Sequence, residues 1–336
     1  MSRSARMKTM CSKNRFKELP RWARLSDHLS RDVSNREIQV ALNMHRLALT
    51  LLVFSSSIFA QTTLQQHVRV IAADAHGKVS VACLLPNSTL NCDLDPHAHP
   101  PMQSVFKFPL AITAFHLVEQ GKLSLDEQVR FLPSDRILPH THSPLQDKYP
   151  QGNVDIPLHE LLQLSISESD NVATDIVLRL VGGPSVVTGY IHSIGVTGFH
   201  LEDGEAGLAR ELAAQYRNWF EPAAAVQLLR RISDNSPLTP QHTQILFDWM
   251  KNTSSGSGRI QGDLPAGTIV VHKTGTSGTR NGVTFATNDI GLITLPDSRR
   301  LAIAVFVTDS SADEATRDAV IARIAKAAYD QARSNP

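Results

Sequence analysis

Residues 268–307 contain three strand-like runs, TIVVHKT at 268–274, DIGLITL at 289–295 and LAIAVFV at 301–307, and an amphipathic helical pattern follows at 313–332. Apolar and β-branched residues dominate each run, and residues that favour turns separate the last two runs. The stretch therefore predicts consecutive strands of one sheet, followed by a helix that packs against it.

Strand-like residues return near the beginning of the chain, in HVRVIAA and VSVACLL within residues 67–94, where turn-forming residues near positions 76 and 87 predict a two-stranded hairpin. From about 104 to 251 the pattern is helical instead. Helices are expected at 105–120, 158–169, 171–181, 222–232 and 239–250. Strands at both ends with helices between them predict one antiparallel sheet, a separate helical lobe and a catalytic cleft between the two.

The composition excludes several classes of protein. The 336 residues include 33 basic and 32 acidic ones and are 42% hydrophobic, which rules out a disordered tail. No basic run supports nucleic-acid binding. Three cysteines cannot build a disulfide scaffold or a cysteine zinc site. The pairs His97-Ala98-His99 and His140-Thr141-His142 lack a third ligand at recognisable spacing, so we expect neither a metal nor another cofactor.

Residues 44–60 have the layout of a secretory signal peptide. An arginine precedes an apolar stretch at 47–54, and small residues end at Ala60. The stretch is too short to span a membrane, so we expect cleavage after Ala60, no stable membrane anchor, and a periplasmic or secreted product. Residues 1–43 are a polar leader, or the true start is Met44.

An exported product keeps two cysteines, Cys83 and Cys92. If Asn87 and Ser88 form a turn, these cysteines face each other across two strands, which allows a disulfide in an oxidising compartment. The alternative, two small buried hydrophobic residues, fits the sequence equally well.

Ser104 and Lys107 begin the first long helical run. Three positions apart, they share one face of the helix. A lysine in a closed cleft can take the serine proton, or can hold the network through which another base acts. Ser-x-x-Lys alone is common, and its plain alternative is a helix cap beside a solvated lysine. The helix is apolar nearly all round, however, which predicts that Lys107 is buried.

Ser169-Asp170-Asn171 lies between two helical runs. A second serine can relay a proton to a leaving nitrogen, and the asparagine amide can donate to a substrate carbonyl. The alternative is a helix N-cap, for which all three residue types are preferred.

Lys273-Thr274-Gly275-Thr276 ends the strand at 268–274. A substrate lying along this strand would meet Lys273 and Thr274 with its carboxylate, and Gly275 would allow close approach. The N–H of Thr276 would join that of Ser104 in an oxyanion hole. The alternative is a strand end with a glycine-rich turn.

The three motifs in this order are the set found in class A β-lactamases and penicillin-binding proteins. The chain resembles a class A serine β-lactamase over residues 65–332. The segments PMQSVFKFPLA, YRNW and LPAGTIVVHKTGTSG are most similar to the extended-spectrum branch that includes the PER and VEB enzymes.

The resemblance implies a serine β-lactamase or penicillin-binding transpeptidase-like α/β (α+β) fold with a five-stranded antiparallel sheet. It implies an α/β lobe from residues 61–98 and 260–336, and a helical lobe from 99–259. The implied catalytic glutamate is Glu205, with Glu202 as a nearby competitor. Many relatives carry, four residues later, an asparagine that holds the deacylating water.

This chain departs from the family pattern there, because it has Ala209. Arg259, 14 residues before Lys273, matches an arginine that binds the substrate carboxylate in some relatives, and Arg280 is the alternative. His142 matches the position of an aromatic residue at the cleft rim.

The implied function is a monomeric serine β-lactamase that confers β-lactam resistance. Its small-molecule substrate would acylate Ser104, and a water activated by Glu205 would hydrolyse the acyl-enzyme. Lys107 and Ser169 complete the catalytic set, and Asn171, Lys273, Thr274, Gly275, Thr276 and Arg259 would hold the substrate. Two rivals share the motifs: a D-Ala-D-Ala peptidase, and a penicillin sensor that acylates without turnover.

Overall fold

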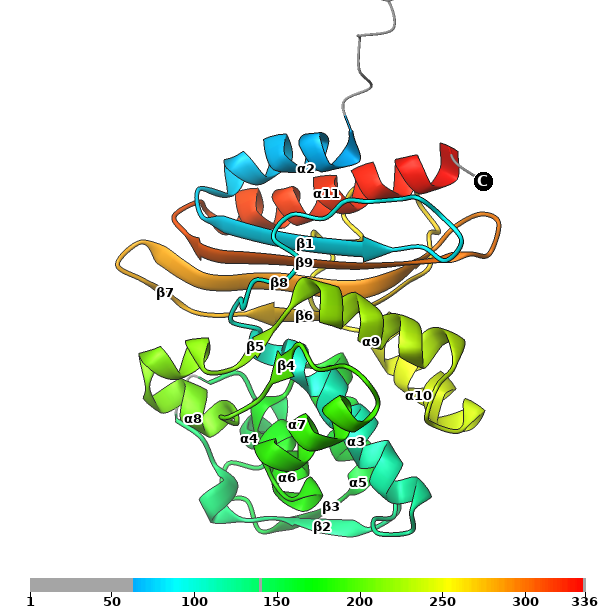
Figure 1. Ribbon diagram of the computed structural model, residues 1–336. Coiled ribbons are helices and arrows are strands. Elements are labelled where there is room, and N and C mark those ends of the chain that lie inside the picture. The colour runs from blue at the N-terminus through cyan, green and yellow to red at the C-terminus, as the bar shows by residue number, and fades with distance from the viewer. Residues whose placement is uncertain (1–62, 139–140, 335–336) are drawn as a thin grey trace, which may run out of the picture. The chain divides into compact units, whose positions relative to one another are not determined.

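The computed structural model describes residues 63–138 and 141–334, so the expected signal peptide at 44–60 lies outside the described residues. A five-stranded antiparallel sheet joins the two ends of the described chain (Figure 1). The strands follow the order β1 (Lys78–Leu84), β9 (Arg300–Ser310), β8 (Val283–Thr294) and β6 (Val270–Thr276), and β7 (Thr279–Arg280) pairs with β8. The predicted α/β fold with this sheet is confirmed.

Both faces of the sheet are covered, which explains the continuous apolar run in β9. Ile303 and Val305 point to one face and Ala304 and Phe306 to the other, and all four are fully buried. Side chains alternate along a strand, so a strand with two covered faces needs apolar residues at every position. Two hydrophobic clusters therefore form, one on each face.

The strand predicted for HVRVIAA is wrong, because these residues form helix α2 (Leu64–Ala72). Thr63 caps the helix by accepting the backbone N–H of Gln66, whose side chain accepts the backbone N–H of Thr63 in return. The buried residues Val68 and Ile71 lie three positions apart on one helical face. The cap and this spacing outweigh the β-propensity of valine and isoleucine.

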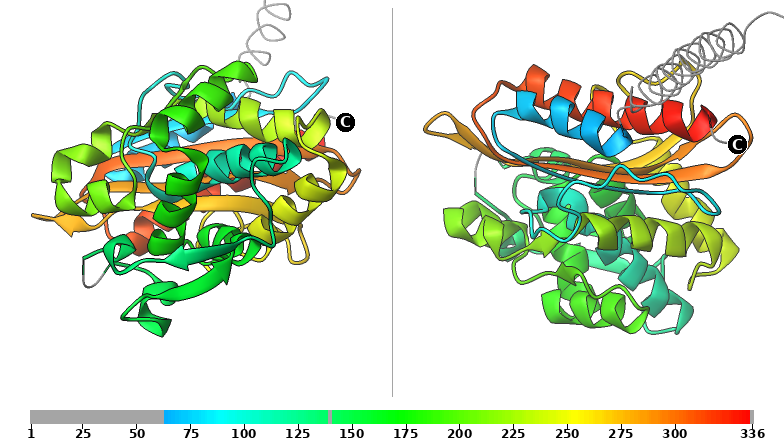
Figure 2. Two further views of the ribbon diagram at one scale, coloured as in Figure 1. Left: turned by 90° about the horizontal axis from the view of Figure 1, so that it is seen from below. Right: turned by 45° about the horizontal axis from the view of Figure 1, so that its top comes forward.

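Helix α11 (Glu314–Ser334), predicted from its amphipathic pattern, lies beside α2 on the same face of the sheet (Figures 1 and 2). Val68 and Ile71 of α2 share a hydrophobic cluster with Val320 and Ile321 of α11 and with Val305 of the sheet. Segments from the two ends of the chain thus build one packed layer.

The other helices lie on the opposite face (Figure 1). They are α3 (Lys107–Glu119), α4 (Pro144–Lys148), α5 (Leu158–Ser167), α6 (Asn171–Val181), α7 (Pro184–Ser193), α8 (Glu205–Arg210), α9 (Pro222–Asp234) and α10 (Pro240–Lys251). The five expected helical runs correspond to α3, α5, α6, α9 and α10, whereas α4, α7 and α8 were not predicted. Among the described residues no single helix is long and apolar enough to cross a membrane, although α6 and α7, bent by 71°, meet that criterion as a pair.

Two short antiparallel pairs complete this part of the chain. Strand β2 (Gln128–Phe131) pairs with β3 (Val154–Pro157), and β4 (Phe199–His200) pairs with β5 (Trp219–Phe220). Strand β5 also lies next to the segment before Ser104, through a bridge between Trp219 and Pro101. This bridge links the loop at 201–218 to the start of α3.

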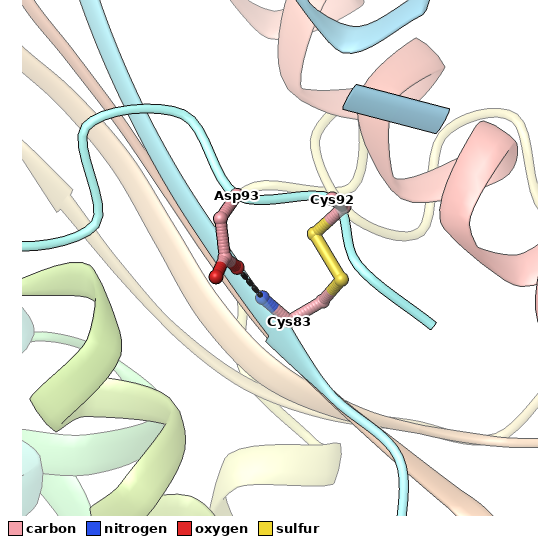
Figure 3. Close-up of side chains that lie close together, drawn as sticks. All are labelled: Cys83, Cys92 and Asp93. Atoms are coloured by element: carbon pink, nitrogen blue, oxygen red, sulfur yellow. Dashed lines mark hydrogen bonds between the residues drawn. A yellow bond between two sulfur atoms is a disulfide. The ribbon is translucent and has the colours of Figure 1, made fainter. Parts of the chain in front are cut away.

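Cys83 and Cys92 form a disulfide, with their Cα atoms 5.7 Å apart (Figure 3). The chain turns near Asn87, which has a φ of 56°, and returns along β1. Leu94 then pairs with Val81 through both backbone hydrogen bonds. The expected turn is confirmed, and of the two alternatives for the cysteines the structure has the disulfide.

Candidate active site

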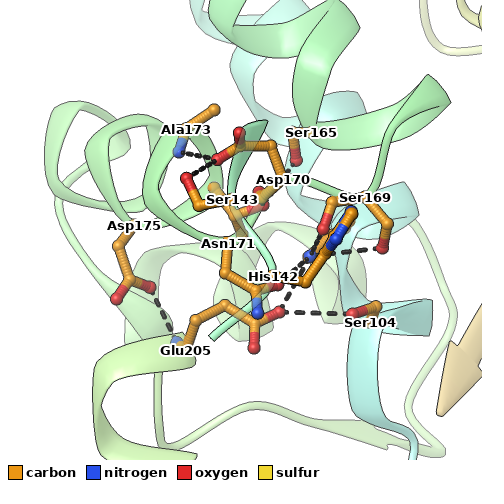
Figure 4. A network of polar contacts seen from close by, with 12 residues as sticks. Ser104, His142, Ser143, Ser165, Ser169, Asp170, Asn171, Ala173, Asp175 and Glu205 are labelled. Atoms are coloured by element: carbon orange, nitrogen blue, oxygen red, sulfur yellow. Dashed lines mark hydrogen bonds and ion pairs between the residues drawn. The ribbon is translucent and has the colours of Figure 1, made fainter. Parts of the chain in front are cut away.

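Ser104 lies in a 3-10 turn, η2 (Gln103–Phe106), that leads directly into the buried helix α3. The preceding residue, Gln103, has a φ of 49°, a left-handed conformation that costs energy for a side chain of this size. Its amide donates to Oε1 of Gln215 at 2.7 Å. The hydroxyl of Ser104 donates to Oε1 of Glu205 at 3.3 Å (Figure 4). A cavity of about 520 Å³ is lined by both residues.

Lys107 is completely buried, as predicted from the apolar helix. Its Nζ donates to the carbonyl oxygen of Ser169 at 2.6 Å and to Oδ1 of Asn171 at 2.6 Å. It also lies 3.0 Å from Oε1 of Glu205. A fourth, longer contact of 3.3 Å joins Nζ to Oγ of Ser169, so the three protons of the ammonium group are all supplied with acceptors. Lys107 therefore holds α3, the 169–171 motif and Glu205 together.

The three residues of the Ser-Asp-Asn motif divide their tasks. Asp170 is a helix N-cap, because Oδ1 accepts the N–H of Ala173 at 2.8 Å, and it also accepts the hydroxyl of Ser143 at 2.9 Å. Ser169 has a φ of 55°, and both Ser169 and Asn171 line a cavity of about 350 Å³ beside Ser104. The cap interpretation is thus correct for the middle residue, while its neighbours face the cavity.

Lys273 reaches the same serine from the sheet. Its Nζ donates to Oγ of Ser169 at 3.0 Å and to the carbonyl oxygen of Thr274 at 3.0 Å, and the side chain is fully buried. Burial, and next the positive charge of Lys107, lower the pKa of Lys273 well below 10.5. The negative charge of Glu205 opposes this shift. Lys273 can therefore release and take up a proton more readily than a solvated lysine.

Glu205 is the first residue of α8 and is 6% exposed. A carboxylate of α6, Asp175, accepts its backbone N–H at 2.7 Å and that of Ala206 at 2.7 Å. Burial, and next the charge of Glu205, raise the pKa of Asp175 to about 6. Gly204 leaves room for this contact, because a Cβ there would lie 2.5 Å from Oδ1 of Asp175.

The buried residue Asn218 fixes the base of the loop that carries Glu205. Its Oδ1 accepts the backbone N–H groups of Glu202 and Asp203 at 2.8 and 2.9 Å, and its Nδ2 donates to the carbonyl of Asp203 at 2.7 Å. Its own carbonyl accepts the N–H of Met102 at 3.2 Å. The loop and the segment before Ser104 are consequently held at a fixed distance.

Arg259 is 4% exposed and points into the protein rather than into a cavity. Its guanidinium donates to Oδ1 of Asp318 at 2.8 Å, to the carbonyl of Asn288 at 3.0 Å and to Oγ1 of Thr276 at 2.8 Å. Thr276 does line both cavities. Arg259 thus reaches the cavities through the hydroxyl of Thr276. The smaller cavity is also lined by Ser254, Ser255 and Thr274.

Gly275 lies against the backbone that precedes Ser104. A Cβ on Gly275 would be 2.5 Å from the carbonyl oxygen of Met102, so a glycine is needed there. Asn288, opposite Gly275 in the sheet, donates from Nδ2 to the carbonyls of Pro101 at 2.8 Å and Met102 at 3.2 Å. This contact fixes Ser104 relative to the end of β6.

The two competing assignments, Glu202 and Arg280, line neither cavity. Glu202 is largely exposed and contacts His200 and Arg217 rather than Ser104. Arg280 is exposed in β7.

Ala209 and His142, the two positions at which the chain departs from or poorly matches the family pattern, both line the larger cavity, and His142 also lines the smaller one.

Three polar residues of the site were not predicted: Asp175, Asn218 and Asn288. Asp175 and Asn288 lie in a helix and a strand without a motif of their own, and Asn218 lies in the YRNW segment, to which the sequence assigned no chemical role. Only the repeated pairing of a buried polar side chain with distant backbone groups identifies them, and a sequence does not show such pairing.

The histidine pair at 97–99 contacts a carboxylate in the structure. His97 Nδ1 and His99 Nε2 lie 2.8 and 3.3 Å from the two oxygens of Glu221. Within the described ranges, the residues grouped closely enough for metal ligation are Cys83, Cys92 and Asp93. Two of these are the disulfide sulfurs, which offer no thiolate ligand.

Comparisons with known proteins agree on one family. The model of the β-lactamase enzyme family matches residues 63–332. Extended-spectrum β-lactamase PER-1 of Pseudomonas aeruginosa is 39% identical, over 84% of this chain and 92% of that protein. β-Lactamase VEB-1 of the same organism is 35% identical, over 76% of this chain and 85% of that protein.

Solved structures give the same result. A β-lactamase from Chitinophaga pinensis superposes with a TM-score of 0.77 at 43% identity, covering 80% of this chain and 99% of that one. The TLA-1 extended-spectrum β-lactamase superposes with a TM-score of 0.76 at 39% identity, covering 80% of this chain and 97% of that one.

Proposed function

The chain belongs to the β-lactamase enzyme family as a class A member, a hydrolase of β-lactams, and from this premise we propose the roles of its residues. Ser104 is the nucleophile that opens the β-lactam amide, and Glu205 activates the water that releases the product. The observation that carries this proposal is the contact of one carboxylate oxygen of Glu205 with both the Ser104 hydroxyl and the Lys107 ammonium.

In acylation, the Ser104 hydroxyl loses its proton as its oxygen bonds to the β-lactam carbonyl carbon. Glu205 Oε1 already accepts this hydroxyl, so we assign it as the proton acceptor. Lys107 keeps the carboxylate in place, because its Nζ lies 3.0 Å from Glu205 Oε1 and is itself held by Ser169 and Asn171. The backbone N–H groups of Ser104 and Thr276 then stabilise the oxyanion.

The amide C–N bond breaks next, and the ring nitrogen needs a proton. Ser169 is placed to donate it, because its hydroxyl receives a hydrogen bond from Lys273 at 3.0 Å. Lys273 can resupply that proton, since burial lowers its pKa well below 10.5. This pair gives the leaving nitrogen a proton route separate from Glu205.

Before deacylation, the proton that Glu205 took from Ser104 passes through Lys107, whose Nζ lies 3.0 Å from Glu205 Oε1 and 3.3 Å from Ser169 Oγ, back to Ser169 and Lys273, so Glu205 is a carboxylate again. In deacylation, Glu205 then takes a proton from a water that attacks the ester carbon, and it passes this proton to Ser104 as the C–O bond breaks. The chain has Ala209 where many relatives have the asparagine amide that holds this water. We assign the positioning of the water to Glu205 and the neighbouring cavity wall, with deacylation as the slower half of the cycle.

Substrate binding uses both cavities. Asn171 donates to the substrate's amide carbonyl, and Lys273, Thr274 and Thr276 hold its carboxylate, because Thr274 and Thr276 line the smaller cavity and the ammonium of Lys273 lies beneath its wall, in contact with Ser169 and Thr274. Gly275 allows the close approach, and Arg259 orients Thr276.

A time course of intact mass with excess benzylpenicillin tests the proposal, with substrate absorbance followed in parallel. Loss of substrate with at most a transient adduct, mapped to Ser104, is the expected result. A lasting adduct without turnover would indicate a penicillin sensor. Turnover of a D-Ala-D-Ala peptide without turnover of penicillin would indicate a peptidase.

We also propose that the enzyme acts as a periplasmic or secreted monomer without a membrane anchor, after removal of a signal peptide at 44–60. Its α/β lobe comprises residues 61–98 and 260–336, and its helical lobe 99–259. Sedimentation of the exported product tests whether it is a monomer. Sequencing of its N-terminus tests the cleavage site, and we expect an N-terminus at Gln61.

A further inference from the structure

A buried histidine and aspartate lie directly behind the proposed active-site strand. His272 immediately precedes Lys273 in β6, and Asp289 lies on the neighbouring strand β8, opposite Thr274. His272 Nδ1 is 3.0 and 2.9 Å from the two carboxylate oxygens of Asp289, and these side chains are 3% and 0% exposed. None of the catalytic roles assigned above uses this pair.

The sheet makes specific room for the imidazole. Gly291 lies opposite His272, and a Cβ on Gly291 would be 2.7 Å from the Cβ of His272. At Gly256, with a φ of 78°, a Cβ would lie 2.3 Å from Cγ2 of Thr274, so this glycine makes room for Thr274 rather than for the imidazole. Gly291 therefore accommodates the histidine, whose Nδ1 faces Asp289.

Asp289 also holds the loop that precedes β6. Its Oδ2 accepts the backbone N–H of Ile260 at 3.1 Å. Ile260 directly follows Arg259, whose guanidinium contacts Thr276 at 2.8 Å. Displacement of the carboxylate would thus shift Arg259 and, through it, the hydroxyl of Thr276 at the cavity wall.

The carboxylate of Asp289 is also near enough to Lys273 to affect the pKa of that lysine. Lys273 is surrounded by the cations Lys107 and Arg259 and by the anions Glu205 and Asp289. The positive charges lower the pKa of Lys273 and the negative charges raise it. Glu205 changes its protonation in the proposed reaction, whereas Asp289, on the far face of the strand, takes no part in it.

We propose that Asp289, oriented by His272, is a positioning residue for the β-lactamase site: it fixes the Arg259 loop and supplies a constant negative charge behind Lys273. This inference rests on the proposed function of Lys273 and Thr276. We expect His272 and Asp289 to affect substrate affinity and the alkaline limit of activity, in addition to stability.

Asp289→Asn removes the charge with little change in shape, and two His272 variants separate hydrogen bonding from packing. In His272→Asn the amide can donate from the position of Nδ1, and in His272→Leu this donor is lost. The control is His242→Leu, because His242 also contacts a partly buried carboxylate, Glu119, at 2.7 Å, away from Lys273.

The measurement is the pH profile of kcat/KM for benzylpenicillin, with KM and kcat determined separately. Activity falls at alkaline pH as Lys273 loses its proton. Asp289→Asn lowers the pKa of Lys273 further, so we expect the alkaline limb to move down by about one pH unit and KM to rise about tenfold. His272→Leu should act in the same direction, because Asp289 then loses the donor that orients its carboxylate, and His272→Asn should remain close to the parent.

Equal loss of stability in His272→Leu and His242→Leu, with the parental pH profile and KM in both, would show that the pair is structural and overturn the inference. If Asp289→Asn does not fold, the two His272 variants decide the question. If the parent enzyme hydrolyses penicillin and the variants keep its pH profile and KM, the inference about Asp289 is wrong while the proposed function stands. A parent that forms no Ser104 adduct contradicts the proposed function as well.

Discussion

Asp175 accepts the backbone N–H of Glu205 in a hydrogen bond of 2.7 Å, so one carboxylate positions the residue that carries another (Figure 4). This arrangement brings two acids close together, with Glu205 buried and Asp175 partly buried. The charge of Glu205 adds to burial and raises the pKa of Asp175 to about 6.

Asp175 should therefore make stability depend on pH. Its pKa is about 6 in the folded protein and 3.8 ordinarily, so the folded state binds this proton more tightly than the unfolded state. The contribution of Asp175 to stability is present below about pH 4 and is lost as the pH rises towards 6.

Asp175→Asn should flatten this fall, since an amide does not titrate. Urea unfolding at intervals from pH 4 to 7 measures the slope. Asp155→Asn is the control, because Asp155 is exposed and paired with Arg130. Parallel pH curves for the parent and Asp175→Asn would contradict the prediction.

Glu205→Gln should form the acyl-enzyme more slowly than the parent and release it more slowly still. The amide can take a proton neither from Ser104 nor from water, and deacylation should fall at least about 100-fold. Intact mass after prolonged mixing with benzylpenicillin should show one stable adduct on Ser104. Glu202→Gln is the matched control in the same loop, and an adduct that persists in that variant instead would move the assignment to Glu202.

Arg259 and Thr276 should act as one unit on substrate affinity. Thr276→Val removes a hydroxyl that we propose binds the substrate carboxylate, and KM should rise about tenfold. Arg259→Lys keeps the charge but loses the contact geometry of the guanidinium. If Arg259 acts through Thr276, the double variant should be no worse than the more impaired single variant. Additive losses would mean that Arg259 meets the substrate by another route.

The disulfide should stabilise the protein without affecting catalysis. Cys83 and Cys92 are 9 positions apart, and neither lines the two active-site cavities. Opening so short a loop should lower the free energy of unfolding by about 2–3 kcal/mol. Urea unfolding with and without dithiothreitol measures the difference, and the Cys83→Ala and Cys92→Ala double variant should not respond to the reagent. A large loss of kcat/KM on reduction would contradict this prediction.

The fold was largely predictable because its main elements have strong periodic patterns. The run LAIAVFV has an apolar residue at every position, which only a strand buried on both faces or a buried helix needs. The residues 67–72 misled the prediction because valine and isoleucine suit both a strand and one face of a helix. The decisive feature was the cap formed by Thr63 and Gln66.

The sequence predicted that the site residues lie together, because three motifs stand on helices and a strand that their patterns identify. Ser104, Ser169 and Lys273 come from three separate elements and meet at the smaller cavity or just beneath it. Asp175, Asn218 and Asn288 were missed for a physical reason. Each is a single polar residue whose partners are backbone groups brought close only by folding, such as the contact of Asn288 with Met102.

The pairing of the first strand with the last has a consequence for how the chain folds. Lys78 pairs with Thr308, so β1 has no partner within the five-stranded sheet until nearly the whole protein has been synthesised. Contacts between such distant positions slow folding, because a long loop must close first. A β-lactamase with this topology remains incomplete during translation, a state in which a chain can still be threaded through an export channel.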